Sequence, residues 1–276
     1  MENHEAFRDS SSEPLVTQTS QACDRESDPI SRQQSNETLD VLCGSKLRVF
    51  QSRAGYRFSL DALVLADFVT VKRSEKLVDL GTGNGIIALL LARLYPSATL
   101  QGVELQPAMV ARAHRNVAVN GLVQRVKILQ GDVREIDERY VLADCDVVVC
   151  NPPYRKPNSG RLSVNDERQI ARHELNGNLG DFLGAGALLL RNNGRMALVY
   201  LAARLGDLIV AMRRAGIEPK RLRMVHSFTE SEASLILLEG VKGGKAGLAV
   251  LPPLVIYRQA KQYTDEVTAI IAGERP

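Results

Sequence analysis

The chain has 276 residues, of which 45% are hydrophobic and 24% charged, and its formal net charge is +3. This composition is typical of a globular protein and excludes a collagen, a fibre and a chain without any folded part. The longest apolar run, Ile86 to Ala92, is far shorter than the roughly 20 residues that cross a bilayer. Because the N-terminus also lacks the apolar core of a secretory signal, we expect a cytoplasmic protein with no membrane partner.

The net charge is the sum of two unlike regions. Residues 1–37 contain three basic and eight acidic side chains, a net of −5, which leaves +8 for residues 38–276. The first region is rich in Ser and Gln and has no helical or strand periodicity, so we expect a disordered tail followed by one folded domain over residues 38–276. The charge of that domain favours a polyanionic partner, although a solvated basic face is about as common.

Short apolar runs alternate with amphipathic segments after the tail. The runs predict strands at 76–80, 100–104, 126–129, 146–150 and 196–200. The amphipathic segments predict helices at 86–95, 108–120, 180–190 and 203–215. This alternation indicates an α/β fold in which helices cover both faces of a parallel sheet. Runs at 221–228, 233–239 and 248–257 are joined without full helices and predict an antiparallel edge.

A glycine-rich loop follows the first of these strands, in the run Asp79-Leu80-Gly81-Thr82-Gly83-Asn84-Gly85. Glycines at alternate positions let the backbone turn tightly and approach a ligand just before a helix begins. The third glycine is one position too early for a dinucleotide fingerprint, and no Gly-Lys-Ser/Thr follows for a phosphate loop. The loop is therefore either a cradle for another cofactor or a tight turn that packs a helix on a strand.

Acidic residues at successive strand ends favour the cradle. Asp79 lies in the first strand, Glu104 ends the second, and Asp132 follows the third. Carboxyl ends of parallel strands meet at one edge of an open sheet, where Glu104 would accept from two ribose hydroxyls and Asp132 from an adenine amino group. Carboxylates there also suit a cationic ligand. S-adenosylmethionine, which combines a sulfonium, a ribose and an adenine, meets these requirements without a phosphate site.

The fourth strand leads directly into Asn151-Pro152-Pro153-Tyr154. These prolines would make a rigid turn in any protein, but beside a cofactor loop the sequence suits the chemistry of an amine. The Asn151 side-chain oxygen and the Pro152 carbonyl can accept the two hydrogens of an amine conjugated to a ring and aim its lone pair at a methyl group. Tyr154 offers a flat face on which an extruded base can stack. We therefore take Asn151, Pro152 and Tyr154 as the catalytic residues.

The two motifs together resemble class I S-adenosylmethionine-dependent amino methyltransferases. The Gly55 to Ala62 block, Gly102 to Gln106, Ala171 to Glu174 and Pro252 to Tyr257 are similar to the bacterial tRNA1(Val) (adenine-N6)-methyltransferase family. This resemblance, which covers the chain from about Leu39 onward, implies a Rossmann-like fold with a seven-stranded, mostly parallel sheet. It also implies methylation of the adenine 3′ of the anticodon of a valine tRNA.

By the same resemblance, Asn151 and Pro152 match the amine-orienting positions and Tyr154 the base-stacking position. The cofactor positions are matched by Asp79, Gly81, Gly83, Gly85, Glu104 and Asp132. Ser59 and Asp61 match a block that lies near the methionine end of the cofactor in related enzymes. An N-cap serine with an acidic residue in the first helical turn explains these two residues equally well.

The basic residues of the domain favour a nucleic-acid partner. Basic stretches containing Lys46, Arg48, Arg53 and Arg57, then Arg155, Lys156 and Arg161, then Lys220, Arg221 and Arg223 suit phosphate contacts from a tRNA substrate. The four cysteines form no Cys-x-x-Cys pair and have no nearby histidine at ligand spacing, so we expect no metal site. A monomer is favoured. The alternatives are a release-factor glutamine methyltransferase, which shares the Asn-Pro-Pro-Tyr loop, and an RNA-binding module without turnover.

Overall fold

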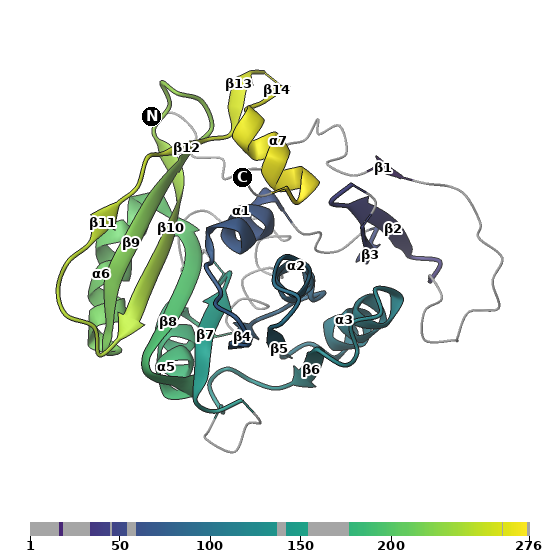
Figure 1. Cartoon of the computed structure of the whole chain (residues 1–276), viewed down its shortest axis with the longest axis horizontal. Helices are drawn as coiled ribbons and strands as arrows, with labels where there is room; N and C mark the ends of the chain where they lie inside the picture. Colours follow the sequence, from purple (N-terminus) through teal and green to yellow (C-terminus); the bar gives the residue numbers. More distant parts are fainter. Residues whose placement is uncertain are drawn as a thin grey trace, which may run out of the picture.

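The computed structural model describes residues 17–18, 34–44, 46–53, 59–136, 142–153, 177–260 and 262–274. Its centre is a nine-stranded sheet of order β11-β9-β10-β8-β7-β4-β5-β6, with β12 also paired to β9 (Figure 1). Five neighbouring strands pair in parallel with one another: β4 (Lys76–Leu80), β5 (Thr99–Glu104), β6 (Val126–Gln130), β7 (Cys145–Cys150) and β8 (Leu190–Leu201). The others are β9 (Ile217–His226), β10 (Ala233–Lys242), β11 (Ala249–Val250) and β12 (Leu254–Val255).

Helices cover both faces of this sheet. One face packs against α1 (Leu60–Phe68), α2 (Ile86–Leu94), α3 (Pro107–Val119) and α7 (Asp265–Ala272). The other packs against α5 (Leu179–Leu189) and α6 (Leu205–Arg214), which a short 3-10 turn at Ala202–Arg204 precedes. In β7, Val147 and Val149 join the first core while Val148 and Cys150 join the second. Both sides of the strand are buried, which is why it forms an unbroken apolar run.

The predicted elements agree with the structure except at the final strand. The runs at 76–80, 100–104, 126–129, 146–150 and 196–200 lie in β4 to β8, and β10 pairs antiparallel with both β8 and β9. The expected strand at 248–257 is wrong as one continuous antiparallel element. It is broken into β11 and β12, which both run parallel to β9. Pro252 and Pro253 lie between them and, because proline has no N–H, cannot continue the ladder.

A separate small sheet precedes the main one. It consists of β1 (Thr17–Gln18), β2 (Glu37–Leu42) and β3 (Leu47–Ser52), in that order. Glu37, which the charge division counts with the acidic tail, is the first residue of β2, and its side chain is fully buried. It accepts from Arg112 at 2.8 Å and from Arg115 at 2.5 Å, both on α3. Burial raises the pKa of Glu37, but hydrogen bonds from Arg115 and Arg112 bring it below its ordinary value.

The last segments of the chain lie beside α1 and the end of β9. A short hairpin, β13 (Tyr257–Gln259) and β14 (Gln262–Tyr263), leads into α7, which packs on α1. Of the helices in the described ranges, none combines the length and the apolar character needed to span a membrane.

Candidate cofactor and active site

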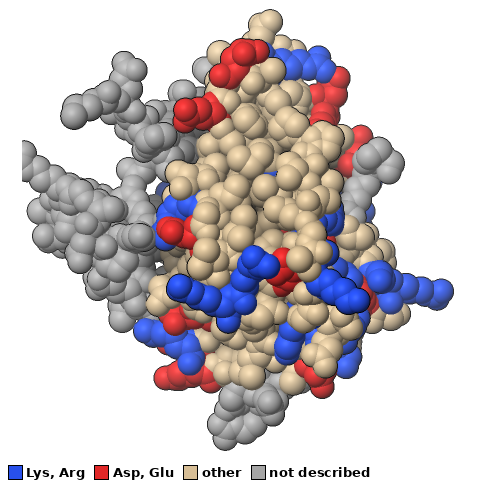
Figure 2. Space-filling view, turned by 90° about the vertical axis from the view of Figure 1, so that its left-hand side faces the viewer, with Lys and Arg blue, Asp and Glu red and all other residues tan. Residues whose placement is uncertain are grey.

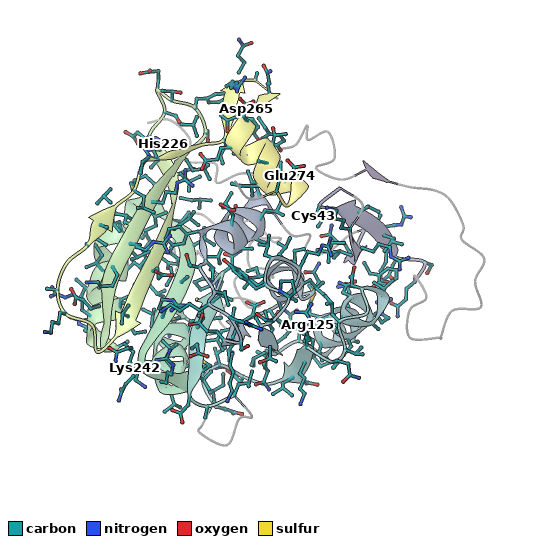
Figure 3. All side chains as sticks on the ribbon, in the orientation of Figure 1. Cys43, Arg125, His226, Lys242, Asp265 and Glu274 are labelled. Carbon is teal, nitrogen blue, oxygen red and sulfur yellow. The ribbon has the colours of Figure 1, made fainter. Side chains whose placement is uncertain are left out.

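The candidate site lies at the edge of the sheet that is formed by the carboxyl ends of the parallel strands, not along an outer strand. In Figure 3, His226 marks this edge at the end of β9, and Lys242 marks the opposite edge at the end of the antiparallel β10. The glycine loop, Glu104 and Asn151 all follow or end parallel strands at the first edge. Open α/β sheets bind their ligands at this edge.

The loop between β4 and α2 needs its glycines. Gly81, Gly83 and Gly85 have φ of +69°, +58° and +87°, in the left-handed region that side chains disfavour. The N–H groups of Gly81 and Thr82 both donate to the Val103 carbonyl, at 2.9 and 3.0 Å, and this holds the turn against β5. The alternating spacing in the sequence is therefore dictated by the backbone conformation.

The surroundings of the three glycines differ. A Cβ added at Gly81 would meet the Phe182 ring at 3.0 Å, and one at Gly85 would lie 3.4 Å from the Ala113 Cβ. At Gly83 an added Cβ would meet no described atom within 4 Å. Gly81 and Gly85 thus permit close packing of α5 and α3 on the loop, whereas Gly83 faces open space that a ligand can fill.

Asp79 is a buried carboxyl group beneath this loop. One oxygen accepts from the Thr82 hydroxyl at 2.5 Å, while Oδ1 has no hydrogen-bond partner among the described residues. Burial, with a smaller contribution from the charge of Glu104, raises the pKa of Asp79 to about 7, against hydrogen bonds from Thr82 and Ala88 that lower it. A buried carboxyl group with an unpaired oxygen is the kind of group that a cationic ligand would stabilise.

Glu104, at the end of β5, is already attached to the loop. Its Oε2 accepts from the Gly83 N–H at 3.0 Å, and its Oε1 accepts from the Gln106 N–H at 2.8 Å. The side chain is thereby fixed next to the open position at Gly83. Each carboxylate oxygen has a second lone pair and can still accept a hydroxyl group.

Asp132 lies two residues beyond β6 at the same edge and is engaged by its neighbour Arg134. The guanidinium of Arg134 bonds both carboxylate oxygens, with Nε at 2.9 Å from Oδ1 and 3.0 Å from Oδ2. This hydrogen bonding holds the pKa of Asp132 below its ordinary value. A charge-assisted pair with both oxygens occupied is an arrangement that the sequence analysis did not anticipate.

Asn151 follows β7 directly, and the strand register locates it. Leu80 pairs with Cys150, so the next residues of the two strands, Gly81 and Asn151, begin the two loops side by side. Pro152 is buried, and Asn151 and Pro153 are half-buried. Tyr154 lies outside the described residues, as do the basic residues Arg57, Arg155, Lys156 and Arg161.

Ser59 and Asp61 begin α1. Ser59 is the N-cap residue but makes no side-chain hydrogen bond to the helix, and Asp61 lies in the first turn with its side chain buried. Their positions agree with the helix-start interpretation, without the hydrogen bond that usually accompanies it. Phe182 and Asn116, which both touch the loop region, were missed by sequence reasoning because neither belongs to a local motif.

Comparison with known proteins adds the family. Residues 57–202 match the model of the methyltransferase small domain. A tRNA1(Val) (adenine(37)-N6)-methyltransferase of Tolumonas auensis is 30% identical over 172 residues, which cover 62% of this chain and 70% of that protein. The chain belongs to this methyltransferase family. A relative with the same name from Parabacteroides distasonis is 26% identical, over 82% of this chain and 93% of its own length.

Solved structures agree on the fold of this methyltransferase. A predicted O-methyltransferase from Agrobacterium tumefaciens superposes with a TM-score of 0.63 at 21% identity, covering 77% of this chain and 96% of its own. A type I restriction-modification methyltransferase subunit from Streptococcus thermophilus gives a TM-score of 0.56 at 18% identity, covering 80% of this chain and 54% of its own. The Rossmann-like class I architecture expected from the sequence is confirmed, with β11 and β12 as additions at one edge.

Proposed function

We propose that this methyltransferase transfers a methyl group from S-adenosylmethionine to the exocyclic N6 amine of an adenine in tRNA. The names of its relatives point to the adenine 3′ of the anticodon of a valine tRNA. The observation that carries the proposal is the register between β4 and β7, which brings Asn151-Pro152 next to the glycine loop. A methyl donor and an amine held by these two loops would meet at one edge of the sheet.

The cofactor fits the residues at this edge. The open side of Gly83 leaves room for a ligand in contact with the backbone, and the buried, unpaired Oδ1 of Asp79 beneath the loop would be stabilised by a cationic group bound there. Glu104 would hold the ribose hydroxyls. Asp132 would accept from the adenine amino group once Arg134 releases one carboxylate oxygen. Ser59 and Asp61 are assigned to the methionine end on the strength of the family resemblance alone.

S-adenosylmethionine, when bound, supplies a methyl group made electrophilic by its sulfonium centre. The protein's task is to orient a weak nucleophile, because the lone pair of an exocyclic amine is delocalised into the ring. The Asn151 oxygen and the Pro152 carbonyl accept the two amine hydrogens, which keeps the nitrogen nearer to tetrahedral with its lone pair aimed at the methyl group. Tyr154 stacks on the adenine, and the proton leaves after transfer.

The test is methyl transfer to unmodified tRNA by the purified chain with labelled S-adenosylmethionine. Asn151→Ala is expected to abolish transfer while tRNA affinity changes by no more than about fivefold, since one neutral hydrogen bond contributes about 1 kcal/mol. The matched control is Asn192→Ala on the exposed part of β8, which is expected to retain full activity. Label in a release factor and none in tRNA would favour the glutamine methyltransferase, and binding without transfer the non-catalytic module.

A further inference from the structure

Two asparagines, Asn116 on α3 and Asn120 at the C-cap of the same helix, dock the N-terminal hairpin onto the methyltransferase fold. The buried Asn116 accepts from the Phe50 N–H at 2.7 Å and donates to the Phe50 carbonyl at 3.2 Å. Asn120 repeats this pattern with Arg48, accepting from its N–H at 2.9 Å and donating to its carbonyl at 2.6 Å. Each side-chain amide thus pairs with β3 as a neighbouring strand would.

The spacing explains why a helix can pair with this strand. Residues four apart on a helix rise about 6 Å along its axis. Residues two apart on a strand advance about 6.6 Å. Asn116 and Asn120 therefore meet Phe50 and Arg48 in register, and β3 lies at the edge of its sheet where those backbone groups need partners.

Asn116 makes one contact that Asn120 does not. Its Nδ2 also donates to the carbonyl oxygen of Asn84 in the glycine loop, at 2.9 Å. The corresponding amide hydrogen of Asn120 goes to the Asn116 carbonyl instead, at 2.7 Å. The orientation of the Asn116 amide is fixed, because two carbonyls require its NH₂ group and one N–H requires its oxygen.

The loop is consequently held at consecutive residues on one side. Gly83 donates to Glu104, Asn84 accepts from Asn116, and Gly85 packs on Ala113 of α3. At Gly83 itself an added Cβ would meet no described atom within 4 Å, which leaves room for the proposed cofactor. A change at Asn116 would therefore alter a loop that contacts the cofactor without altering any group that touches it.

We propose that Asn116 is a positioning residue for the methyl donor, which ties the glycine loop to the β2–β3 hairpin so that the loop is preorganised for binding. The proposal rests on the proposed function only in assigning S-adenosylmethionine to that loop. Asn120 docks the same hairpin on the same helix but has no bond to the loop. The pair therefore separates positioning of the cofactor loop from general stability.

The two matched variants are Asn116→Asp and Asn120→Asp. Each keeps the side-chain shape and the acceptor oxygen while replacing the donor NH₂ by a second oxygen, so that carbonyls formerly bonded now face a carboxylate. In Asn116→Asp the affected carbonyls belong to Phe50 and to Asn84 of the loop. In Asn120→Asp they belong to Arg48 and Asn116.

Binding of S-adenosylmethionine to the ligand-free full chain is measured by calorimetry, without tRNA. Asn116→Asp is expected to raise the Kd about tenfold and Asn120→Asp less than about twofold, while both lower the melting temperature. In turnover, the KM for the donor should rise in Asn116→Asp with a smaller change in kcat. Equal effects of the two variants on Kd, or no effect of Asn116→Asp, would overturn the proposal.

A second measurement covers the case in which Asn116→Asp does not fold. In the wild-type chain, hydrogen exchange of the Phe50 amide is followed with and without saturating S-adenosylmethionine. If the loop and hairpin are tied through Asn116, the donor should slow this exchange severalfold, and an unchanged rate would contradict the coupling. A wild-type chain that fails to bind the donor at all would contradict the proposed function instead.

Discussion

At the level of a single residue, opposing interactions act on the pKa of the buried carboxyl group of Asp79. Its raised pKa reflects burial first, then repulsion by Glu104, with hydrogen bonds from Thr82 and Ala88 working in the other direction. In the ligand-free protein near neutral pH, this carboxyl is therefore divided between its neutral and ionised forms. A cationic cofactor beside Oδ1 would favour the ionised form, so binding should release a proton in this pH range.

The pH dependence of stability in the ligand-free protein should reflect the titration of this group. A carboxyl whose pKa rises from 3.8 to about 7 on folding binds more protons in the folded state between those values, so its contribution is lost as the pH rises through that window. Asp79→Asn cannot ionise and lacks the effect. We expect the melting temperature of the wild type to fall relative to that of Asp79→Asn from about pH 4 to 7. Above about pH 7 the difference between the two melting temperatures should stay constant.

Thermal unfolding across this range for both proteins checks the expectation. Asp207→Asn is a suitable control, because Asp207 is exposed and pairs with Arg204 at the surface. Parallel pH curves for the wild type and Asp79→Asn would show that Asp79 has an ordinary pKa in the folded protein.

At the level of the element, the glycine loop combines backbone strain with ligand access. Gly83 and Gly121 both have positive φ, +58° and +67°, and an added Cβ at either meets no described atom within 4 Å. Alanine at either position should therefore cost a similar amount of stability, about 1–2 kcal/mol. Of the two, only Gly83 belongs to the loop at the candidate cofactor site, so we expect Gly83→Ala alone to weaken donor binding, by about tenfold.

Denaturant unfolding and calorimetry of the two variants test the loop separately from the fold. Matched losses of stability with different donor affinities would support a role for Gly83 in ligand contact. If Gly121→Ala weakened the donor as much as Gly83→Ala, the loss would reflect general destabilisation.

The elements that sequence predicts well here carry a local signal. The glycine spacing of the loop requires positive φ at alternate residues, and the two-sided burial of β7 produces a continuous apolar run, so each is legible within a short window. The β2–β3 hairpin has no such signal. Glu37 lies at the end of a polar tail, and its partners Arg112 and Arg115 are more than 70 residues away in the sequence.

The candidate site divides in the same way. The sequence could place Asp79, Glu104 and Asn151 at one edge of the sheet because the strand ends of a parallel sheet converge, a rule of topology that needs no side-chain contact. Phe182 against Gly81 and Asn116 against Asn84 depend on tertiary packing between distant elements. The Asp132–Arg134 pair, by contrast, joins residues two apart and was open to prediction from charge pattern alone.

At the level of the whole molecule, the basic side chains that the structure describes largely make contacts within the protein already. Of the arginines expected to meet RNA, Arg221 pairs with Glu239 and lies over Phe68, and Arg223 pairs with Glu266. Arg48 and Arg53 donate to backbone carbonyls of Val119 and Glu37. On the face that carries β9, β11 and α6, Lys and Arg gather mainly over the lower half (Figure 2).

This distribution changes what salt should do to tRNA binding. A protein that neutralises six or more phosphates loses roughly a thousandfold in affinity between about 50 and 200 mM salt. Each cation removed lowers the slope of log affinity against log salt concentration by about one. Arg221→Gln should keep the wild-type slope and instead lower the melting temperature, because its charge is already paired with Glu239. Lys46→Gln, at an exposed turn of the hairpin, should lower the slope without affecting stability.

Filter binding of unmodified tRNA over a salt series measures both slopes. A flat wild-type response, or an equal loss of slope in Arg221→Gln, would mean that the +8 charge of residues 38–276 is not arranged for RNA in this way.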